Sequence, residues 1–402
     1  MTSFDTSPTL AVWRALLAVV VVFVMLATTG WSAVRDQHVG GERELALAAW
    51  ARDRTAGREL PGADAPPSRL ARFFATLTSA QRMALAVRHP SVVGNLNGAP
   101  VTMRYRANRV ALGRAAALER ARAHDPELSP GGRAEAQARY GRFRSLLKER
   151  RQILAFDPSG RGRAAEVFGN LDRASRVFVV VPGVDTHLLT LERSKRRYAA
   201  PVGMAESLYG AERSASPGTR TAVIAWADYT APAGVGMDAA LGGLAAEGAI
   251  RLNALVRALP GGSKVSLFCH SYGSVVCGVA AHRAPARVAD IAVAGSPGMR
   301  AAHAWQLRTG ARIWAMRDGD DWIEDVPHLE FGGIGHGADP VDPAFGARVV
   351  SATGAAGHSG YFVPGTESLD NFAAIGVGAY GAVRCASADR TCHSGISGGL
   401  EG

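Results

Sequence analysis

From about residue 164 onward, short apolar runs alternate with longer stretches of helical pattern. The runs are rich in Val and Ile, which is typical of strands buried on both faces. We predict strands at residues 177–181, 221–226, 264–268, 291–294 and 312–316, and helices at residues 238–259 and 274–283. Strand–helix alternation of this kind gives a mostly parallel sheet with helices on both faces. The pattern therefore predicts an α/β domain over residues 164–381.

The residues before this domain are predicted to be helical. Apolar side chains recur at helical spacing from Leu70 to Leu77, and further helical patterns cover residues 108–123 and 133–154. We therefore assign residues 68–163 to a helical segment. A linker at residues 36–67 precedes it, because the sequence ELPGADAPPS breaks any helix. A Gly/Ser-rich tail at residues 382–402 ends the chain.

Residues 15–34 are the one stretch long and apolar enough to cross a bilayer. A helix of this length spans about 30 Å, the thickness of the hydrocarbon core. We predict that residues 1–35 hold a retained transmembrane anchor; a cleaved signal peptide and a buried core helix are the alternatives. Thr28, Thr29 and Trp31 make a poor cleavage site. The prediction is a single-pass cell-membrane protein with an extracytoplasmic body, or a secreted protein if the segment is cleaved.

Composition and charge exclude some classes of protein. The chain has 402 residues, of which 47% are hydrophobic, and this excludes a disordered chain. The formal charge is +10, but Lys148, Lys195 and Lys264 are the only lysines, so 42 of the 45 basic residues are arginines. Such an excess of Arg, together with abundant Ala and Gly, is what a GC-rich coding sequence produces. We predict no nucleic-acid partner, since no binding motif accompanies the charge.

Four cysteines in 402 residues exclude a disulfide scaffold. Cys385 and Cys392 lie in the tail, where three readings stay open: a small-loop disulfide, two unpaired thiols, or metal binding together with His393. Cys269 and Cys277 fall in a predicted strand and a predicted helix, where we expect packing residues.

The most specific chemical signal is the sequence KVSLFCHSYGSVVCGVAA at residues 264–281. An apolar strand leads directly into a turn centred on Ser271, and a helix of small residues follows. This arrangement is that of a nucleophile elbow, in which Cys269 and Gly273 occupy the positions that must be small. The turn raises the Ser271 hydroxyl above the sheet. It also directs the Tyr272 amide toward the place where an oxyanion would form.

A serine nucleophile needs a base and a carboxylate that orients the base, in the chain order Ser, acid, His. Three carboxylates follow the strand at residues 312–316: Asp318, Asp320 and Asp321. We favour Asp321, because an apolar pair behind it can anchor the loop, and Asp318 is second.

The histidines downstream of Ser271 that compete as base are His328, His336, His358 and His393. We choose His358, because the small residues of its Gly-rich loop let the ring reach Ser271. His270 adjoins Ser271, but its side chain should point away from the hydroxyl. The second oxyanion donor is expected after the strand at residues 177–181, where the Val184 amide is our choice and Gly183 is close behind. Asp185 is expected to start a helix.

At this point the chain resembles a known family. The matching pieces are HPSVVGNLNGAPVTMRYRANR, FGNLDRASRVFVVVPG, HSYGS, VAGSPGM, DWIEDVPHLEFGGIGHGADPVDPAFGAR and GHSGYFVPGTESLDNFAAIGVG. They resemble an actinobacterial alpha/beta-hydrolase family long catalogued as a domain of unknown function. The resemblance implies an alpha/beta-hydrolase fold and a triad of Ser271, Asp321 and His358, with Asp321 at the head of the DWI piece. The family motif often has Gly where this chain has Cys269.

These observations predict a serine hydrolase that acts on an ester or similar acyl bond and needs no cofactor or metal. Ser271 attacks, His358 moves the proton, Asp321 orients the imidazole, and the amides of Tyr272 and Val184 bind the oxyanion. The expected partners are a small-molecule or lipid-like acyl substrate and, through residues 15–34, a membrane. An acyltransferase with the same triad and a membrane-tethered, non-catalytic binding protein are the alternatives. The sequence carries no signal for a particular oligomeric state.

Overall fold

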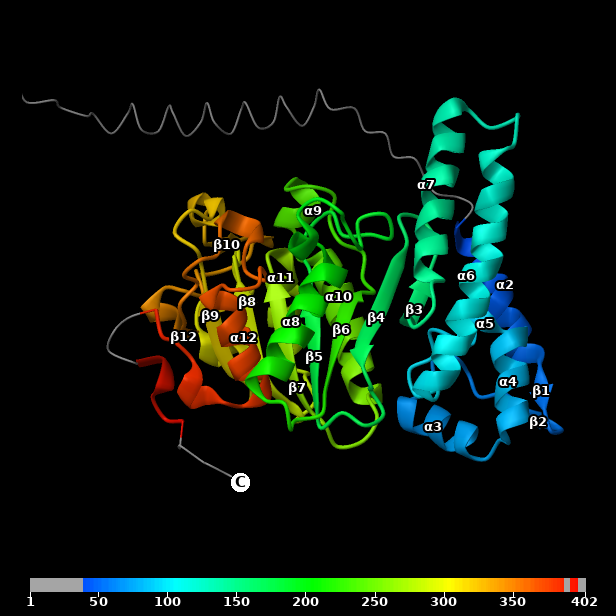
Figure 1. Cartoon of the computed structure of the whole chain (residues 1–402), viewed down its shortest axis with the longest axis horizontal. Helices are drawn as coiled ribbons and strands as arrows, with labels where there is room; N and C mark the ends of the chain where they lie inside the picture. Colours follow the sequence, from blue (N-terminus) through cyan, green and yellow to red (C-terminus); the bar gives the residue numbers. More distant parts are fainter. Residues whose placement is uncertain (1–38, 387–390, 397–402) are drawn as a thin grey trace, which may run out of the picture. The chain divides into compact units, whose positions relative to one another are not determined.

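An eight-stranded sheet organises the computed structural model of the protein, which describes residues 39–386 and 391–396 (Figure 1). The described residues from Glu42 onward form one compact unit. The strands are β3 (Gln152–Asp157), β4 (Arg163–Gly169), β5 (Arg176–Val181), β6 (Thr221–Ala227), β7 (Lys264–His270), β8 (Val288–Ala294), β9 (Arg312–Met316) and β12 (Arg348–Val349). Their order in the sheet is β12-β9-β8-β7-β5-β6-β4-β3.

The five predicted strands coincide with β5 to β9, and all pairs from β12 to β6 are parallel. The prediction of a mostly parallel sheet is confirmed. β4 and β3 extend one edge in antiparallel fashion, and the sequence pattern does not reveal them. Charged Arg163 and Glu166 interrupt the apolar pattern of β4. Residues 152–154, which the helical pattern assigns to a helix, begin β3 instead, so the sheet starts before residue 164.

Helices cover both faces of the sheet, as the pattern predicts. They are α8 (Pro201–Ala215), α10 (Gly243–Ala258), α11 (Tyr272–Ala281) and α12 (Glu367–Val377). Along β5, Val177, Val179 and Val181 pack into the core with α10 and α11. Phe178 and Val180 point to the opposite face and pack with α8 and α12. This alternation explains why β5 is an unbroken apolar run, because each face of the strand is buried under helices.

The predicted helical segment is present. It comprises α2 (Val39–Arg52), α3 (Pro67–Ala75), α4 (Ser79–Arg88), α5 (Pro90–Val93), α6 (Val101–Ala123) and α7 (Pro130–Leu146), with a small hairpin of β1 (Arg54–Thr55) and β2 (Arg58–Glu59). Side chains of this segment form hydrogen bonds with backbone groups of β3, the outermost strand of the sheet. The Asn95 amide donates to the carbonyl of Phe156 at 2.8 Å and accepts from the Phe156 N–H at 3.1 Å. Asn108 donates to the carbonyl of Ile153 at 2.9 Å. The edge strand therefore exposes fewer unpaired backbone groups.

Short elements lie in the loops between the strands and after them. These are α9 (Met237–Ala240), β10 (Glu330–Phe331), β11 (Ile334–Gly335), η1 (Arg197–Ala199), η2 (Ala304–Leu307), η3 (Trp322–Asp325), η4 (Pro343–Phe345), η5 (Gly357–Ser359), η6 (Tyr380–Ala382) and η7 (Thr391–His393). The strand order places β5 between β6 and β7. The carboxyl ends of β5 and β7 thus meet where the direction of winding reverses, which is the usual position of ligand sites in open α/β sheets.

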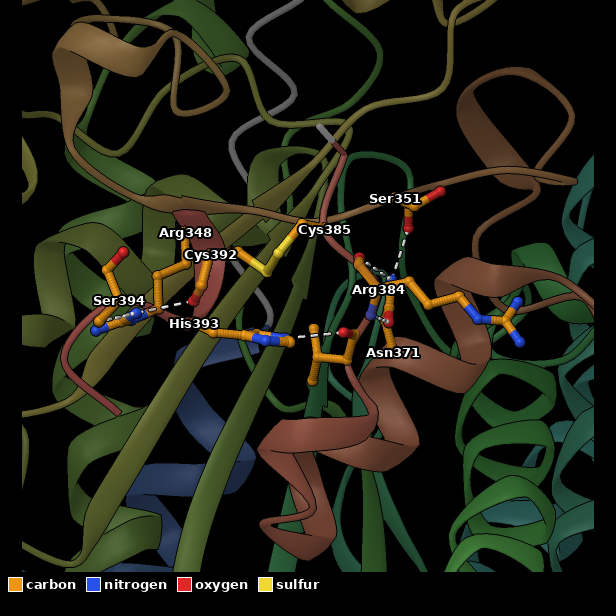
Figure 2. Close-up of a disulfide and its surroundings, with 9 residues drawn as sticks. Arg348, Ser351, Asn371, Arg384, Cys385, Cys392, His393 and Ser394 are labelled. Carbon is orange, nitrogen blue, oxygen red and sulfur yellow. Dashed lines mark hydrogen bonds between the residues drawn. A yellow bond between two sulfur atoms is a disulfide. The ribbon is translucent and has the colours of Figure 1, made fainter. Parts of the chain in front are cut away.

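A disulfide between Cys385 and Cys392 holds the tail against the sheet (Figure 2). Next to it, the Arg348 guanidinium donates to the carbonyl of Cys392 at 2.8 Å. Of the three readings left open by the sequence, the structure has the disulfide. The sulfurs lie near His393, but sulfurs bonded to each other are not the thiolates that a metal site requires. The His393 ring hydrogen-bonds the carbonyl of Val383 at 2.9 Å.

The predicted anchor at residues 15–34 lies outside the described residues. Among the helices that the structure does describe, none combines the length and the apolar character needed to span a bilayer.

Glu212 of α8 is fully buried. Burial raises the pKa of this carboxyl well above its ordinary value. An acid whose pKa is raised in the folded state makes the protein less stable as pH increases from its unfolded pKa, about 4.3, toward the folded pKa. Glu212 therefore destabilises the fold at neutral pH.

We predict that Glu212→Gln raises the melting temperature relative to the wild type, and that the difference grows as the pH is raised from about 4. The upper limit of this effect is about 1.4 kcal/mol per pH unit. Thermal unfolding at several pH values measures it. Glu206→Gln is the matched control, since Glu206 lies in the same helix but is only half-buried and is paired with Arg197. Parallel pH profiles of the wild type and Glu212→Gln would contradict the prediction.

Candidate active site

Ser271 occupies a sharp turn between β7 and α11. Its φ is +55°, in the left-handed region that non-glycine residues rarely adopt, as a nucleophile elbow requires. A Cβ at Gly273 would collide with the carbonyl oxygen of Val181 at the end of β5. A Cβ at Gly183 would lie 2.6 Å from the Cβ of Ser271. The turn therefore depends on two glycines that leave room for the backbone. Gly273 follows Ser271 in the chain, and Gly183 lies in the loop after β5.

Cys269 and Cys277 are joined in a disulfide, so the expectation that they are simple packing residues is wrong. Cys269 lies near the end of β7, two residues before Ser271. Cys277 lies about one and a half turns into α11. Because the chain reverses at Ser271, the helix returns past the strand and brings the two Cα atoms to 6.5 Å, within the range that a disulfide spans. Both side chains are buried. The bond closes a loop that contains Ser271.

The structure brings the predicted nucleophile, base and acid together. His358 lies in η5, and its Nε2 is 2.8 Å from the Oγ of Ser271. Its Nδ1 is 2.8 Å from an oxygen of Asp321, which follows β9. This arrangement fits a ring that carries its proton on Nδ1, donates it to the carboxylate and accepts from the serine hydroxyl at Nε2.

The choice between the acid candidates follows from the contacts. The Oδ1 of Asp321 contacts His358 and also accepts from the Ile323 N–H at 2.9 Å. The hydroxyl of Tyr361 donates to its Oδ2. Burial acts to raise the pKa of Asp321, but the hydrogen bonds from His358 and Tyr361 outweigh it and hold this pKa below its ordinary value. Asp321 is thus an ionised carboxylate beside the imidazole.

Asp318 has a different place in the site. Its Oδ2 accepts from the Gly357 N–H at 2.8 Å, directly before His358. Its own N–H donates to the Tyr361 hydroxyl at 3.0 Å. No pattern in the sequence alone marks Tyr361 as a site residue. The signal available was its position three residues after His358 in the same Gly-rich loop.

His270 points away from the Ser271 hydroxyl, as expected. Its Nε2 lies 2.5 Å from the carbonyl oxygen of His358, so the ring donates to the backbone of that residue. Burial, together with the nearby His358, lowers the pKa of His270 to about 4. The ring is therefore neutral near neutral pH and holds the loop that carries His358.

Tyr272 directly follows Ser271, and Val184 follows Gly183, which lies against the Ser271 side chain. Neither the Val184 N–H nor the Tyr272 N–H donates to an acceptor in the described part of the chain. The buried hydroxyl of Tyr229 donates to the carbonyl of Pro182 at 2.6 Å and fixes the loop after β5. The expectation that Asp185 starts a helix is wrong: this residue has a φ of +56° and accepts from a loop amide through its side chain.

Residues 157–331 match the model of a family described as alpha/beta hydrolase. The match includes β5, the elbow and Asp321, and the observed strand order agrees with it. The chain thus contains a domain with the alpha/beta hydrolase fold. The domain continues beyond the matched residues, because His358 and α12 lie past residue 331.

Mycobacterial proteins of uncharacterized function resemble this chain. The uncharacterized protein Rv2079 of Mycobacterium tuberculosis (strain H37Rv) is 29% identical over 378 residues, which cover 79% of this chain and 56% of the relative. The chain therefore spans little more than half the length of that relative. The uncharacterized protein Rv0963c of the same organism is 32% identical over 180 residues, covering 43% of this chain and 66% of the relative.

Two solved structures show weaker likeness to the hydrolase domain and its surroundings. A 2,6-dihydroxy-pseudo-oxynicotine hydrolase has 12% identity and a TM-score of 0.27, over 68% of this chain and 78% of that chain. An esterase from Rhizomucor miehei has 11% identity and a TM-score of 0.28, over 52% of this chain and 80% of that chain. The fold assignment rests on the family match and the sheet order rather than on these two likenesses.

We predict that the variant with Cys269→Ser and Cys277→Ser is less stable than the wild type by about 2.5 kcal/mol, because a closed loop of this size restricts the unfolded chain. Urea unfolding measures the difference. The variant with Cys385→Ser and Cys392→Ser is the matched control, since that bond closes a loop of nearly equal length in the tail.

The two disulfide variants are expected to differ in the reactivity of Ser271. Loss of the elbow bond should slow the reaction of Ser271 with a serine-directed probe, whereas loss of the tail bond should not. Thiol titration of the unfolded wild type should detect no free thiol. Four free thiols in protein kept under oxidising conditions, or equal probe reactivity of the two variants, would contradict this role of the bond.

Proposed function

We propose that the protein is a serine hydrolase that cleaves an ester or a related acyl bond. The observation that carries the proposal is the position of the His358 ring, which lies 2.8 Å from both the Ser271 hydroxyl and the Asp321 carboxylate. A base between a nucleophile and an orienting carboxylate is the arrangement that activates serine. The alpha/beta hydrolase family match supports the same class of reaction.

In the first half of the proposed reaction, the Ser271 Oγ attacks the carbonyl carbon and its proton passes to Nε2 of His358. Asp321 stabilises the imidazolium that forms. When the tetrahedral intermediate collapses, the bond to the leaving alcohol breaks and His358 donates the proton to that oxygen. In the second half, water attacks the acyl-enzyme, His358 takes a proton from the water, and the acid is released as Ser271 regains its hydrogen.

The amides of Val184 and Tyr272 are proposed to stabilise the oxyanion. Neither amide has another acceptor among the described residues, and Gly183, which precedes Val184, lies against Ser271. Tyr272 is also the first residue of α11, where the helix dipole favours negative charge. Removing one such donor typically lowers the rate by about 10²–10³-fold.

The body of the protein is proposed to lie outside the cytoplasm. All four cysteines are paired in disulfides, and such bonds persist in oxidising compartments. The uncharged stretch at residues 15–34 is the proposed membrane anchor on the strength of the sequence.

We predict that a fluorophosphonate probe labels the full-length chain and that Ser271→Ala abolishes the labelling. His358→Ala should reduce it strongly, because the base is lost. Asp321→Asn should slow it on the order of 10⁴-fold, as the loss of the orienting carboxylate does in serine proteases. In-gel fluorescence of the tagged chain measures the labelling over time.

His303→Ala is the matched control for His358→Ala. His303 is also in the hydrolase domain, but its ring bonds the carbonyl of Ala344 at 2.9 Å, and its loss should leave labelling unchanged. A wild type that stays unlabelled between about pH 6 and pH 9 would overturn the hydrolase proposal and favour a binding protein of the same fold. Product analysis with an added alcohol distinguishes hydrolysis from acyl transfer.

The proposed topology is tested with reporters fused to the C-terminus of the full-length chain. We expect a reporter that is active only outside the cytoplasm, such as alkaline phosphatase, to be active. A reporter that is active only in the cytoplasm should be inactive. The reverse pattern would overturn the extracytoplasmic assignment without bearing on the chemistry of Ser271.

A further inference from the structure

Half of the exposed large hydrophobic side chains in the described residues come from two short segments. One segment runs from Val235 through α9 to Leu241, and the other runs from η3 through β10 and β11. The side chains are Val235, Met237, Leu241, Trp322, Leu329, Phe331 and Ile334. Single exposed apolar residues are common on protein surfaces, but such a concentration indicates a binding surface.

These two segments meet above the carboxyl ends of the strands, where Ser271 lies. The first follows β6 and the second follows β9, which lie on opposite sides of β7 in the sheet. Leu241 and Ile334 nevertheless form an antiparallel bridge. Figure 1 shows α9 and β10 at the same end of the molecule as the start of α11. The loops therefore join beyond the carboxyl end of β7.

The joined loops are fastened to the residue next to the nucleophile. The hydroxyl of Tyr272 donates to the carbonyl of Leu241 at 3.1 Å. The His336 ring packs edge-on against the Tyr272 ring and hydrogen-bonds the carbonyl of Ala239 at 2.6 Å. The apolar surface is thus positioned by the same residue whose amide is the proposed oxyanion donor.

One arginine connects the two loops from below. Arg300 donates to the carbonyls of Gly333 and Gly335 and pairs with Glu330 at 2.6 Å. The guanidinium also lies where a side chain at Gly242 would be. Arg300 thereby supports both loops from below. Among the apolar side chains of the surface, Phe331 is 85% exposed and Val235 is 72% exposed.

We propose that these two loops form an acyl platform, made of Val235, Met237, Leu241, Leu329, Phe331 and Ile334, that binds the hydrocarbon chain of a long-chain acyl ester. The inference rests on the proposed hydrolase function and specifies its substrate class. The leaving oxygen of an ester must lie beside Nε2 of His358 to receive its proton. The platform is attached at Tyr272, whose amide is the proposed donor to the oxyanion, so we assign it to the acyl side of the ester.

The platform is tested with the full-length chain held in amphipol, so that no free detergent competes for the apolar surface. The test variant combines Phe331→Ser and Val235→Ser. The matched control combines Trp305→Ser and Ile250→Ser, which remove an aromatic and an aliphatic side chain of similar exposure, 73% and 68%. Neither pair includes a residue of the proposed catalytic machinery. The substrates are p-nitrophenyl esters from acetate to dodecanoate, used as monomers.

For the wild type and the control, kcat/KM is expected to rise with acyl length by up to about fourfold per methylene, the value of fully burying that group. The platform variant should lose at least about tenfold in kcat/KM for the dodecanoate ester and stay within about twofold for the acetate ester. A wild type without chain-length preference, or a platform variant that keeps the wild-type preference, would overturn the proposal.

The failures of the two proposals are distinguishable. If the wild type hydrolyses no ester and takes up no fluorophosphonate, the hydrolase function itself fails. If it hydrolyses the acetate ester without regard to chain length, only the platform fails. If the platform variant keeps its chain-length profile but loses binding to phosphatidylglycerol vesicles, or changes from dimer to monomer, the surface serves a lipid bilayer or a second copy and the acyl proposal is overturned.

Discussion

The close approach of three backbone segments around Ser271 is the constraint on which the site depends. The end of β5, the end of β7 and the start of α11 converge there, and side chains at Gly183 or Gly273 would push them apart. The strained φ of Ser271 persists because the surrounding backbone leaves no room for another conformation. The Cys269–Cys277 bond ties the incoming strand to the outgoing helix. The position of the hydroxyl is therefore set by the backbone, and few side-chain motions can displace it.

The base depends on a second set of constraints, because His358 lies in a loop rather than on the sheet. Asp321 holds one side of its ring, His270 holds its carbonyl, and Asp318 holds the amide before it. Gly295 at the end of β8 leaves space for this arrangement, since a Cβ there would lie 2.7 Å from an oxygen of Asp321 and 3.1 Å from Nδ1 of His358. The loop is thus ordered by hydrogen bonds that converge from β7 and β9.

Much of this arrangement could be predicted from local sequence. The five buried strands follow from their apolar runs, and the elbow follows from a strand, a turn and a helix in succession around Ser271. Asp321 could be preferred over Asp318 only weakly from the residues, because both follow β9 and their hydrogen bonds depend on how the loop folds back. The motif resemblance pointed to Asp321, and the geometry places that carboxylate, not Asp318, against the His358 ring.

What the sequence does not reveal are the features created by distant segments. β4 pairs with β6 as an antiparallel neighbour in the sheet, but its charged residues hide the strand pattern. Cys269 and Cys277 look like packing residues until the chain reversal at Ser271 brings strand and helix side by side. Tyr361 gains its role only when its loop folds against Asp321. In each case the contact that matters joins residues whose neighbouring sequence gives no indication that they will meet.

The sheet order also separates the parts of the chain that stabilise the fold from those that select a substrate. The helical segment packs on β3, at the far edge of the sheet, and β4, β6 and β5 lie between that edge and β7. At that edge, Asn108 of α6 hydrogen-bonds the backbone of β3. β3 is four strands away from β7, which leads into Ser271. The loops after β6 and β9 approach the site instead, and they are joined to it through Tyr272. Changes in these loops can therefore alter substrate choice while the elbow and the sheet stay intact, because none of their exposed apolar side chains belongs to the core.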